Sequence, residues 1–207
     1  VIDTFLPLET GFHNLAIISS KQRFPRQARK TALGLLGAGQ MMFLKVIIVV
    51  DEEHQVKDLE KLLDALHSKV NIPEDLVTLK GMVADSLAHT SPWENVHDKL
   101  IIDATTPPEG DPIDRPMERS VGESLAISAS AIEGVVQARM MRPSMMVVTT
   151  EVEGSPSPEE SVEETDNHLA RLQREKISAI RDSIWSLGSA SDLKWLFITD
   201  SVSYTHL

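Results

Sequence analysis

The sequence predicts an α/β fold, a three-layer, open and mostly parallel sheet with helices on both faces, extended by a degenerate β-α-β unit. Three observations lead to this prediction. Residues 45–51 read Lys-Val-Ile-Ile-Val-Val-Asp, and five consecutive β-branched aliphatic residues leave no polar face, which is typical of a strand buried on both sides. Residues 15–20 form a second aliphatic run, and an amphipathic helix fills the gap between the two. Residues 194–200 repeat the Lys–strand–Asp pattern late in the chain.

The first half of the chain is expected to alternate strands and helices. A short extended segment (1–13) precedes the strand at 15–20, and Pro25 suits the first turn of a helix that runs to about Gln40. After the central strand, a helix is predicted over 56–69, a third strand over 76–79, a short helix over 83–88 and a fourth strand over 100–102. The apolar faces of the two longer helices are Ala28, Ala32, Leu35 and Leu36, and Leu59, Leu62, Leu63 and Leu66.

The second half is predicted to repeat this order. Four prolines make 106–118 irregular, and a helix (129–140) then precedes a strand (145–150). Residues 151–166 contain seven acids and no base, which is typical of a solvated loop or a disordered insertion. A long helix (167–187) and the strand at 194–200 follow. We interpret strand, helix, Lys–strand–Asp as a degenerate internal repeat, although any two buried parallel strands would also look alike.

The same order suggests how the chain is divided. We expect an α/β core domain over 1–106, and a proline-rich connection with an α/β extension over 107–201. The last six residues (202–207, Val-Ser-Tyr-Thr-His-Leu) resemble a translated sequencing adaptor and are expected to be non-native. Because the chain also begins at Val1 within what reads as interior sequence, we expect it to be a fragment of a longer protein.

The composition excludes several classes of function. The 207 residues include no cysteine, which rules out disulfides, thiolate catalysis and Cys-type zinc sites. A net charge of -11 argues against a general nucleic-acid binder, since phosphate neutralisation needs an excess of Lys and Arg. The longest apolar run is far shorter than the roughly 20 residues of a membrane helix. A soluble, cytoplasmic protein without stable membrane insertion is the expectation.

Glycine and basic residues offer two possible phosphate sites. Asp51 ends a second strand, where a dinucleotide-binding fold places its ribose-binding acid. However, Gly34, Gly37 and Gly39 come a full helix too late to approach a pyrophosphate. The basic cluster, Lys21, Arg23, Arg26, Arg29 and Lys30, could hold an anion at a helix N-terminus or form ion pairs with the protein's own acidic loops.

The remaining polar residues show no complete catalytic constellation. The histidines before the tail have no metal-binding spacing, and each is expected on the surface or in a loop: His13, His54, His67, His89, His97 and His168. Asp51, Glu52 and Glu53 could bind a hard cation, but three acids after a strand are also typical of a solvated helix entry.

Four short motifs follow one another between residues 21 and 105. Residues 21–29 read Lys-Gln-Arg-Phe-Pro-Arg-Gln-Ala-Arg, and residues 45–53 form a Lys–strand–Asp run followed by acids. Pro73-Glu74-Asp75 forms a turn, and Ser91-Pro92 precedes Lys99 and Asp103-Ala104-Thr105. Together they resemble the C-terminal domain of the UbiD family of decarboxylases, from Ile2 to about Thr105. Arg26 stands where that family usually has glycine, and His97-Asp98 replace a usual Gly-Ser.

The resemblance implies a parent enzyme, a non-oxidative carboxy-lyase acting on an aromatic or unsaturated acid with prenylated FMN and a divalent metal (Mn or Mg). Residues 34–42 and the extension to Asp200 look most like the longer, menaquinone-type branch, which implies quinone biosynthesis. In this family the catalytic residues and most ligands lie in the preceding N-terminal and split-barrel domains, while the C-terminal domain supports oligomerisation and closes over the active site.

On this reading no residue of the chain is expected to be catalytic, to bind the cofactor or to bind the metal, and the fragment alone is expected to be inactive. The family-motif positions expected to be structural or near the pocket are Lys21, Gln27, Arg29, Lys45, Asp51, Lys99 and Asp103. The alternative is a stand-alone α/β module that binds a nucleotide or another protein.

Overall fold

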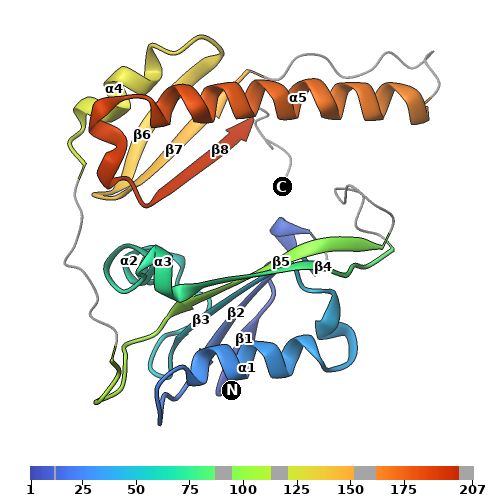
Figure 1. Cartoon of the computed structure of the whole chain (residues 1–207), viewed down its shortest axis with the longest axis vertical. Helices are drawn as coiled ribbons and strands as arrows, with labels where there is room; N and C mark the ends of the chain where they lie inside the picture. Colours follow the sequence, from blue (N-terminus) through green and yellow to red (C-terminus); the bar gives the residue numbers. More distant parts are fainter. Residues whose placement is uncertain (12, 87–94, 113–120, 152–161, 201–207) are drawn as a thin grey trace. The chain divides into compact units, whose positions relative to one another are not determined.

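The computed structural model describes residues 1–11, 13–86, 95–112, 121–151 and 162–200. The chain separates into two compact units, Val1–Met117 and Glu118–Leu207, each of which is described here by itself. Both units combine sheet and helix (Figure 1), so the predicted α/β class is confirmed. The division predicted at residue 106 and the stricter three-layer description stay predictions.

Unit 1 contains a five-stranded sheet in the order β1-β2-β3-β5-β4. The strands are β1 (Asp3–Phe5), β2 (Leu15–Ser20), β3 (Val46–Asp51), β4 (Leu76–Val83) and β5 (Val96–Ala104). β2, β3 and β5 are parallel, whereas β1 and β4 pair antiparallel at the two edges. The sheet is therefore mixed, and only its centre is parallel as predicted.

The central position of β3 follows from its sequence. Ile47, Val49 and Val50 are each no more than 1% exposed, and Ile48 is also buried, as predicted for a strand covered on both faces. On one face, Ile47 and Val49 pack with residues of β2 and β5 and with Ala28 and Ala32 of α1 (Gln27–Leu36). Figure 1 shows α2 (Leu59–Ser68) and α3 (Ile72–Asp75) on the opposite side of this sheet.

Two predictions for unit 1 are wrong in detail. The second helix begins at Leu59 rather than at 56, because the Asp58 carboxylate accepts a hydrogen bond from the Lys61 N–H (3.1 Å) and caps it; Leu59 is consequently exposed. No helix begins at Val83, because β4 continues to that residue and pairs antiparallel with β5. The predicted helix over 83–88 extends into residues outside the described part of the chain.

Unit 2 contains a three-stranded sheet in the order β6-β7-β8, with β6 (Val135–Arg142) antiparallel and β8 (Trp195–Asp200) parallel to β7 (Met145–Thr150). Its helices are α4 (Ser124–Ser130) and α5 (Val162–Trp185). Leu125 and Ala129 of α4 and Ile180 and Ile184 of α5 pack with β7 in one core cluster. The two strands predicted at 145–150 and 194–200 are confirmed.

The helix predicted over 129–140 is wrong, since α4 ends at Ser130 and β6 occupies most of that range. Gly134 adopts a φ of +83°, which ends the helical path, and the β-branched pair Val135-Val136 then enters a strand. Residues 162–166, predicted as part of a solvated loop or disordered insertion, belong to α5. The preceding residues 152–161 lie outside the described residues.

The predicted repeat appears as two matching strand–helix–strand units. β2 pairs with β3 from Leu15↔Val46 to Ser20↔Asp51, and β7 pairs with β8 from Met145↔Trp195 to Thr150↔Asp200. In both repeats a 3-10 helix precedes the second strand, and an antiparallel strand, β1 or β6, pairs with the other edge of the first strand. This part of the repeat is confirmed, and it makes β8 the counterpart of β3.

We expect Gly134→Ala to destabilise unit 2 by about 1–2 kcal/mol. The residue has a left-handed φ, and an added Cβ would lie 3.1 Å from Cε of Lys176 on α5. Urea unfolding followed by tryptophan fluorescence measures the change, since Trp185 and Trp195 belong to this unit. Gly188→Ala is the control, because its Cβ would meet nothing within 4 Å; equal effects of the two substitutions would contradict the argument.

Candidate functional site

The carboxyl ends of the parallel strands in unit 1 carry a row of buried polar side chains. Ser19 and Ser20 end β2, Asp51 ends β3, and Asp103 and Thr105 lie at the end of β5; all five are at most 8% exposed. In open α/β sheets this edge is where ligands bind. The row contains two of the family-motif positions, Asp51 and Asp103, and is therefore the first candidate for a functional site.

Asp51 joins three segments. Its carboxylate accepts hydrogen bonds from Lys69 Nζ (2.5 Å), from the Thr106 N–H (2.8 Å) and from the Thr106 hydroxyl (2.7 Å). Burial alone would raise the pKa of Asp51, but the bonds from Lys69 and Thr106 outweigh burial and hold the pKa below its ordinary value. Asp51 is thus an ionised tie between β3, the end of α2 and the segment after β5.

Asp103 is committed to its own turn. Its Oδ1 accepts hydrogen bonds from the Thr105 hydroxyl (2.6 Å) and from the Thr105 N–H (3.1 Å), and the side chain is buried. Such an Asx-type turn shapes the end of β5. Both acids of this edge therefore hold the local chain path together.

Three members of the basic cluster contact acidic or carbonyl groups of the same unit. Lys21 Nζ lies 3.1 Å from Glu52 Oε1, Arg26 Nη1 lies 3.2 Å from Asp75 Oδ1, and Arg29 donates to the Glu74 carbonyl. Asp75 is fully buried, so Arg26 neutralises a buried carboxylate. These contacts favour the ion-pair interpretation of the cluster over an anion site.

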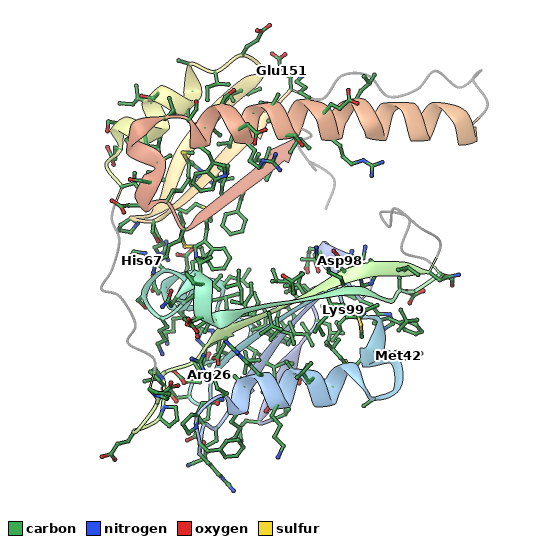
Figure 2. The ribbon with its side chains drawn as sticks, viewed as in Figure 1. Arg26, Met42, His67, Asp98, Lys99 and Glu151 are labelled. Carbon is green, nitrogen blue, oxygen red and sulfur yellow. The ribbon has the colours of Figure 1, made fainter. Side chains whose placement is uncertain are left out.

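Lys99 forms the most constrained polar contact of unit 1, at the opposite, amino edge of the parallel strands. Only 2% exposed, its ammonium donates to the carbonyls of Met42 (2.7 Å), Leu44 (2.8 Å) and Val83 (2.9 Å) (Figure 2). Burial and, secondarily, the charge of Lys45 lower the pKa of Lys99 to about 8. Three donors matched to three acceptors make this lysine a structural clamp.

The other motif positions have separate surroundings. The Gln27 side chain accepts a hydrogen bond from the Arg23 N–H (2.7 Å) at the start of α1. Lys45 precedes β3 on the same edge as Lys99, and burial lowers its pKa. Lys45 and Lys99 therefore lie at the amino edge of the parallel strands. The other five positions lie toward the carboxyl edge, where β2 ends and α1 begins, and each of them has its own local surroundings.

The histidine prediction is wrong for two residues, since His67 lies buried in α2 and His97 lies buried in β5. His13 lies in a turn, as predicted, but is also buried, and its Nδ1 lies 2.9 Å from Asp85 Oδ2. His89 lies outside the described residues. Among the described residues, no group of three or more His, Asp or Glu could hold a metal ion. Asp51 and Asp103 have the internal partners given above, so the described residues do not fit the divalent metal implied by the resemblance.

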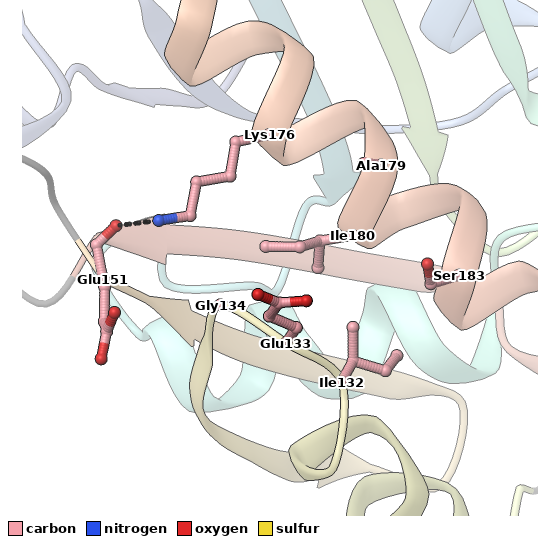
Figure 3. Close-up of a pocket in the computed structure, with 8 residues that line it drawn as sticks. All are labelled: Ile132, Glu133, Gly134, Glu151, Lys176, Ala179, Ile180 and Ser183. Carbon is pink, nitrogen blue, oxygen red and sulfur yellow. Dashed lines mark hydrogen bonds between the residues drawn. The ribbon is translucent and has the colours of Figure 1, made fainter.

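Unit 2 has a pocket of about 470 Å³ between α5 and the turn before β6 (Figure 3). Lys176 Nζ donates to the carbonyl of Glu151 (3.3 Å), and Figure 3 shows the Glu133 carboxylate beneath Ile180. Glu133 and Glu151 are exposed, and the pocket floor is formed by Ile132 and Ile180. The pocket combines two solvated acids with a single ammonium and has no arrangement for nucleophilic or acid–base chemistry.

These observations define a class of protein: an α/β domain whose buried polar residues hold its own strands and turns together. A protein-family model for the 3-octaprenyl-4-hydroxybenzoate carboxy-lyase C-terminal domain (UbiD_C) matches residues 1–104, half of the chain. The chain belongs to the UbiD family through this C-terminal domain.

Two relatives match a segment of similar length. An uncharacterised protein of Archaeoglobus fulgidus is 39% identical over 105 residues, and one of Aquifex aeolicus is 41% identical over 106. Each alignment covers 51% of this chain and 22% of the relative. The chain thus spans about a fifth of the length of these relatives.

The solved structures that match part of the chain include a vanillic acid decarboxylase and a UbiD-class enzyme. The open form of vanillic acid decarboxylase from Sedimentibacter hydroxybenzoicus is 33% identical, with a TM-score of 0.45, over 49% of this chain and 23% of that chain. HmfF from Pelotomaculum thermopropionicum in complex with FMN is 23% identical, with a TM-score of 0.47, over 55% of this chain and 25% of that chain.

Lys99→Met is expected to destabilise unit 1 by about 2 kcal/mol, because three buried carbonyls lose their donor. Urea unfolding followed by far-UV circular dichroism measures the loss. Lys80→Met, which replaces an exposed lysine of β4, is the matched control. A Lys99 variant as stable as the control would show that the clamp contributes nothing.

Stability is expected to depend on pH through Asp51. Its pKa is lower in the folded than in the unfolded state, so its contribution is present above the unfolded pKa and is lost as the pH falls through the folded pKa. At pH 7 Asp51→Asn should cost about 1–2 kcal/mol, and the gap to the parent protein should narrow below about pH 4. Unfolding series at several pH values test this, and a gap constant down to pH 3 would refute it.

Proposed function

We propose that the chain is the C-terminal part of a non-oxidative decarboxylase that acts on an aromatic or unsaturated carboxylic acid. The observation that carries this proposal is the match of residues 1–104 to the carboxy-lyase C-terminal domain. Sequence relatives that are 39% and 41% identical over 105 and 106 residues, each far longer than the match, support a multidomain parent.

In this proposal the parent uses prenylated FMN and a divalent metal, Mn or Mg, held by N-terminal and split-barrel domains of the same polypeptide. An evolved dimeric form of the UbiD-class enzyme HmfF binds prFMN in its solved structure. The satisfied acids at the carboxyl edge of the described sheet support placing both groups outside this chain. When bound, the flavin would supply the electrophilic centre for loss of CO₂.

We assign unit 1 a role in closing the active site and in oligomerisation of the parent. What supports this assignment is the match of residues 1–104 to the carboxy-lyase C-terminal domain, because the resemblance implies these two roles for that domain. The resemblance of residues 34–42 to the menaquinone-type branch suggests a place in quinone biosynthesis, and a cytoplasmic location fits such a role. Among the described residues, none of the helices is both long and apolar enough to cross a membrane.

Recovery of the full reading frame from the source DNA tests the proposal. We expect an upstream split-barrel domain, and we expect the full-length protein, expressed with a supply of prenylated FMN, to release CO₂ from aromatic or α,β-unsaturated acids. The 207-residue chain alone, as the control, should be inactive. Decarboxylation by the 207-residue chain would place catalytic groups within it. A start codon just before Val1, together with tight binding of a mononucleotide, would favour the stand-alone module instead.

A further inference from the structure

β8 is an edge strand in the described part of unit 2, with β7 as its neighbour on one side (Figure 1). The Trp195 N–H donates to the Ser144 carbonyl (3.1 Å), and successive residues of a parallel strand bond alternately to the two sides. The N–H groups of Leu196 and Ile198 therefore face away from β7. No strand of the described part of the chain pairs with them, so they form a row to which another strand could bond.

The other edge strands of the described sheets carry features that discourage pairing. β1 has only three residues, and the pairing of β4 with β5 shifts register beside Lys80 and Gly81. The pairing of β6 with β7 shifts register twice, and β6 carries Arg139 and Arg142. Short length, bulges and basic residues are the usual protection of a sheet edge.

β8 has none of these features. All six of its residues pair with β7 in continuous register, and the strand Trp-Leu-Phe-Ile-Thr-Asp contains no proline and no basic residue. An aliphatic and aromatic edge of this kind is a template for addition of another strand. Its sequence is typical of an interior strand, which has a neighbouring strand on each side.

Burial supports the same conclusion. Ile47 and Val49 of β3, which has a strand on each side, are at most 1% exposed. Their counterparts in the repeat, Leu196 and Ile198 of β8, are only half-buried, and Phe197 is 37% exposed. β3 owes its burial to α1 as well as to its two neighbouring strands, and a strand placed beside β8 would supply the missing neighbour and reduce the exposure of these side chains.

The sequence around β8 is complementary to itself. In an antiparallel pair centred on Phe197, position 194, a lysine, falls opposite position 200 of the second copy, an aspartate, so the sequence places opposite charges at each end of the pair. Within the pair, Leu196 lies opposite Ile198 and Trp195 opposite Thr199. The two residues whose N–H groups face outward, Leu196 and Ile198, are then partners in the new ladder, as the hydrogen-bond pattern requires.

We propose that the outer edge of β8, which is unpaired among the described residues, pairs antiparallel with β8 of a second copy of this chain and joins the two three-stranded sheets into one. The second copy is the favoured occupant because it offers the same unprotected edge and because the charges at the strand ends match. Self-pairing of this kind is isologous, as in most homodimers. The interface lies outside residues 1–104, so the proposal does not rest on the decarboxylase function and can fail without affecting it.

Sedimentation velocity of the full chain over about a hundredfold range of concentration tests the proposal. We expect a monomer–dimer equilibrium. Lys194→Glu and Asp200→Lys should each weaken the dimer by about tenfold, because each brings like charges together at both ends of the strand pair. The double variant Lys194→Glu with Asp200→Lys should restore dimerisation, since it exchanges the charges and keeps them opposite.

A second variant tests the strand pairing without changing the charges at positions 194 and 200. Phe197→Lys would place two ammonium groups opposite each other at the centre and should abolish the dimer. Phe24→Lys is the matched control, since Phe24 is similarly exposed (44%) but lies in unit 1, and it should leave the dimer intact. Circular dichroism confirms that each variant is folded.

A chain that stays monomeric at every concentration, or a dimer unchanged by the single charge reversals and by Phe197→Lys, would overturn the proposal. A double variant that is weaker than either single variant would overturn it as well. Protection of the Leu196 and Ile198 amides from hydrogen exchange only at dimer-forming concentrations would support it directly.

Discussion

The Lys99 ammonium is the contact on which the geometry of unit 1 depends. No carboxylate of the described residues pairs with it, and a buried cation of that kind is tolerated only where every donor is satisfied. It binds three carbonyls. Met42 belongs to the 3-10 helix before β3, Leu44 lies between that helix and β3, and Val83 is the last residue of β4. One side chain of β5 thus fixes where β3 and β4 begin and end relative to it.

The carboxyl edge follows from that clamp through strand register. Because Val46 lies opposite Leu100, Val50 lies opposite Ala104, and the chain that leaves β5 passes beside the end of β3. Asp51 can then reach Thr106, and its bond to Lys69 ties the end of α2 to the same point. The satisfied acids at this edge explain why a site that looks functional in the sequence is structural in the fold.

Strands were predictable wherever burial on both sides leaves a continuous aliphatic run, as in β2, β3 and β7. Prediction failed where a backbone feature overrides the pattern: Gly134 at a positive φ separates α4 from β6, and the Asp58 cap sets the start of α2. At the candidate site, the sequence identified Asp51 and Lys99 as notable residues. It could not reveal their partners, because carbonyl groups and threonines distant in the chain carry no pattern of their own.

The internal repeat explains why the two units end differently. In unit 1 the strand β3 is followed by α2, α3 and β4, and β5 then pairs with its outer edge. Its faces are covered by helices, α1 on one side and α2 with α3 on the other (Figure 1). In unit 2 the same arrangement reaches β8, and within the described residues the sheet ends there with its aliphatic side chains half-buried. β8 is the counterpart of β3 in the repeat and keeps the aliphatic sequence of a strand that has a neighbour on each side. Its outer edge therefore retains the hydrogen-bonding and apolar character of an interior strand.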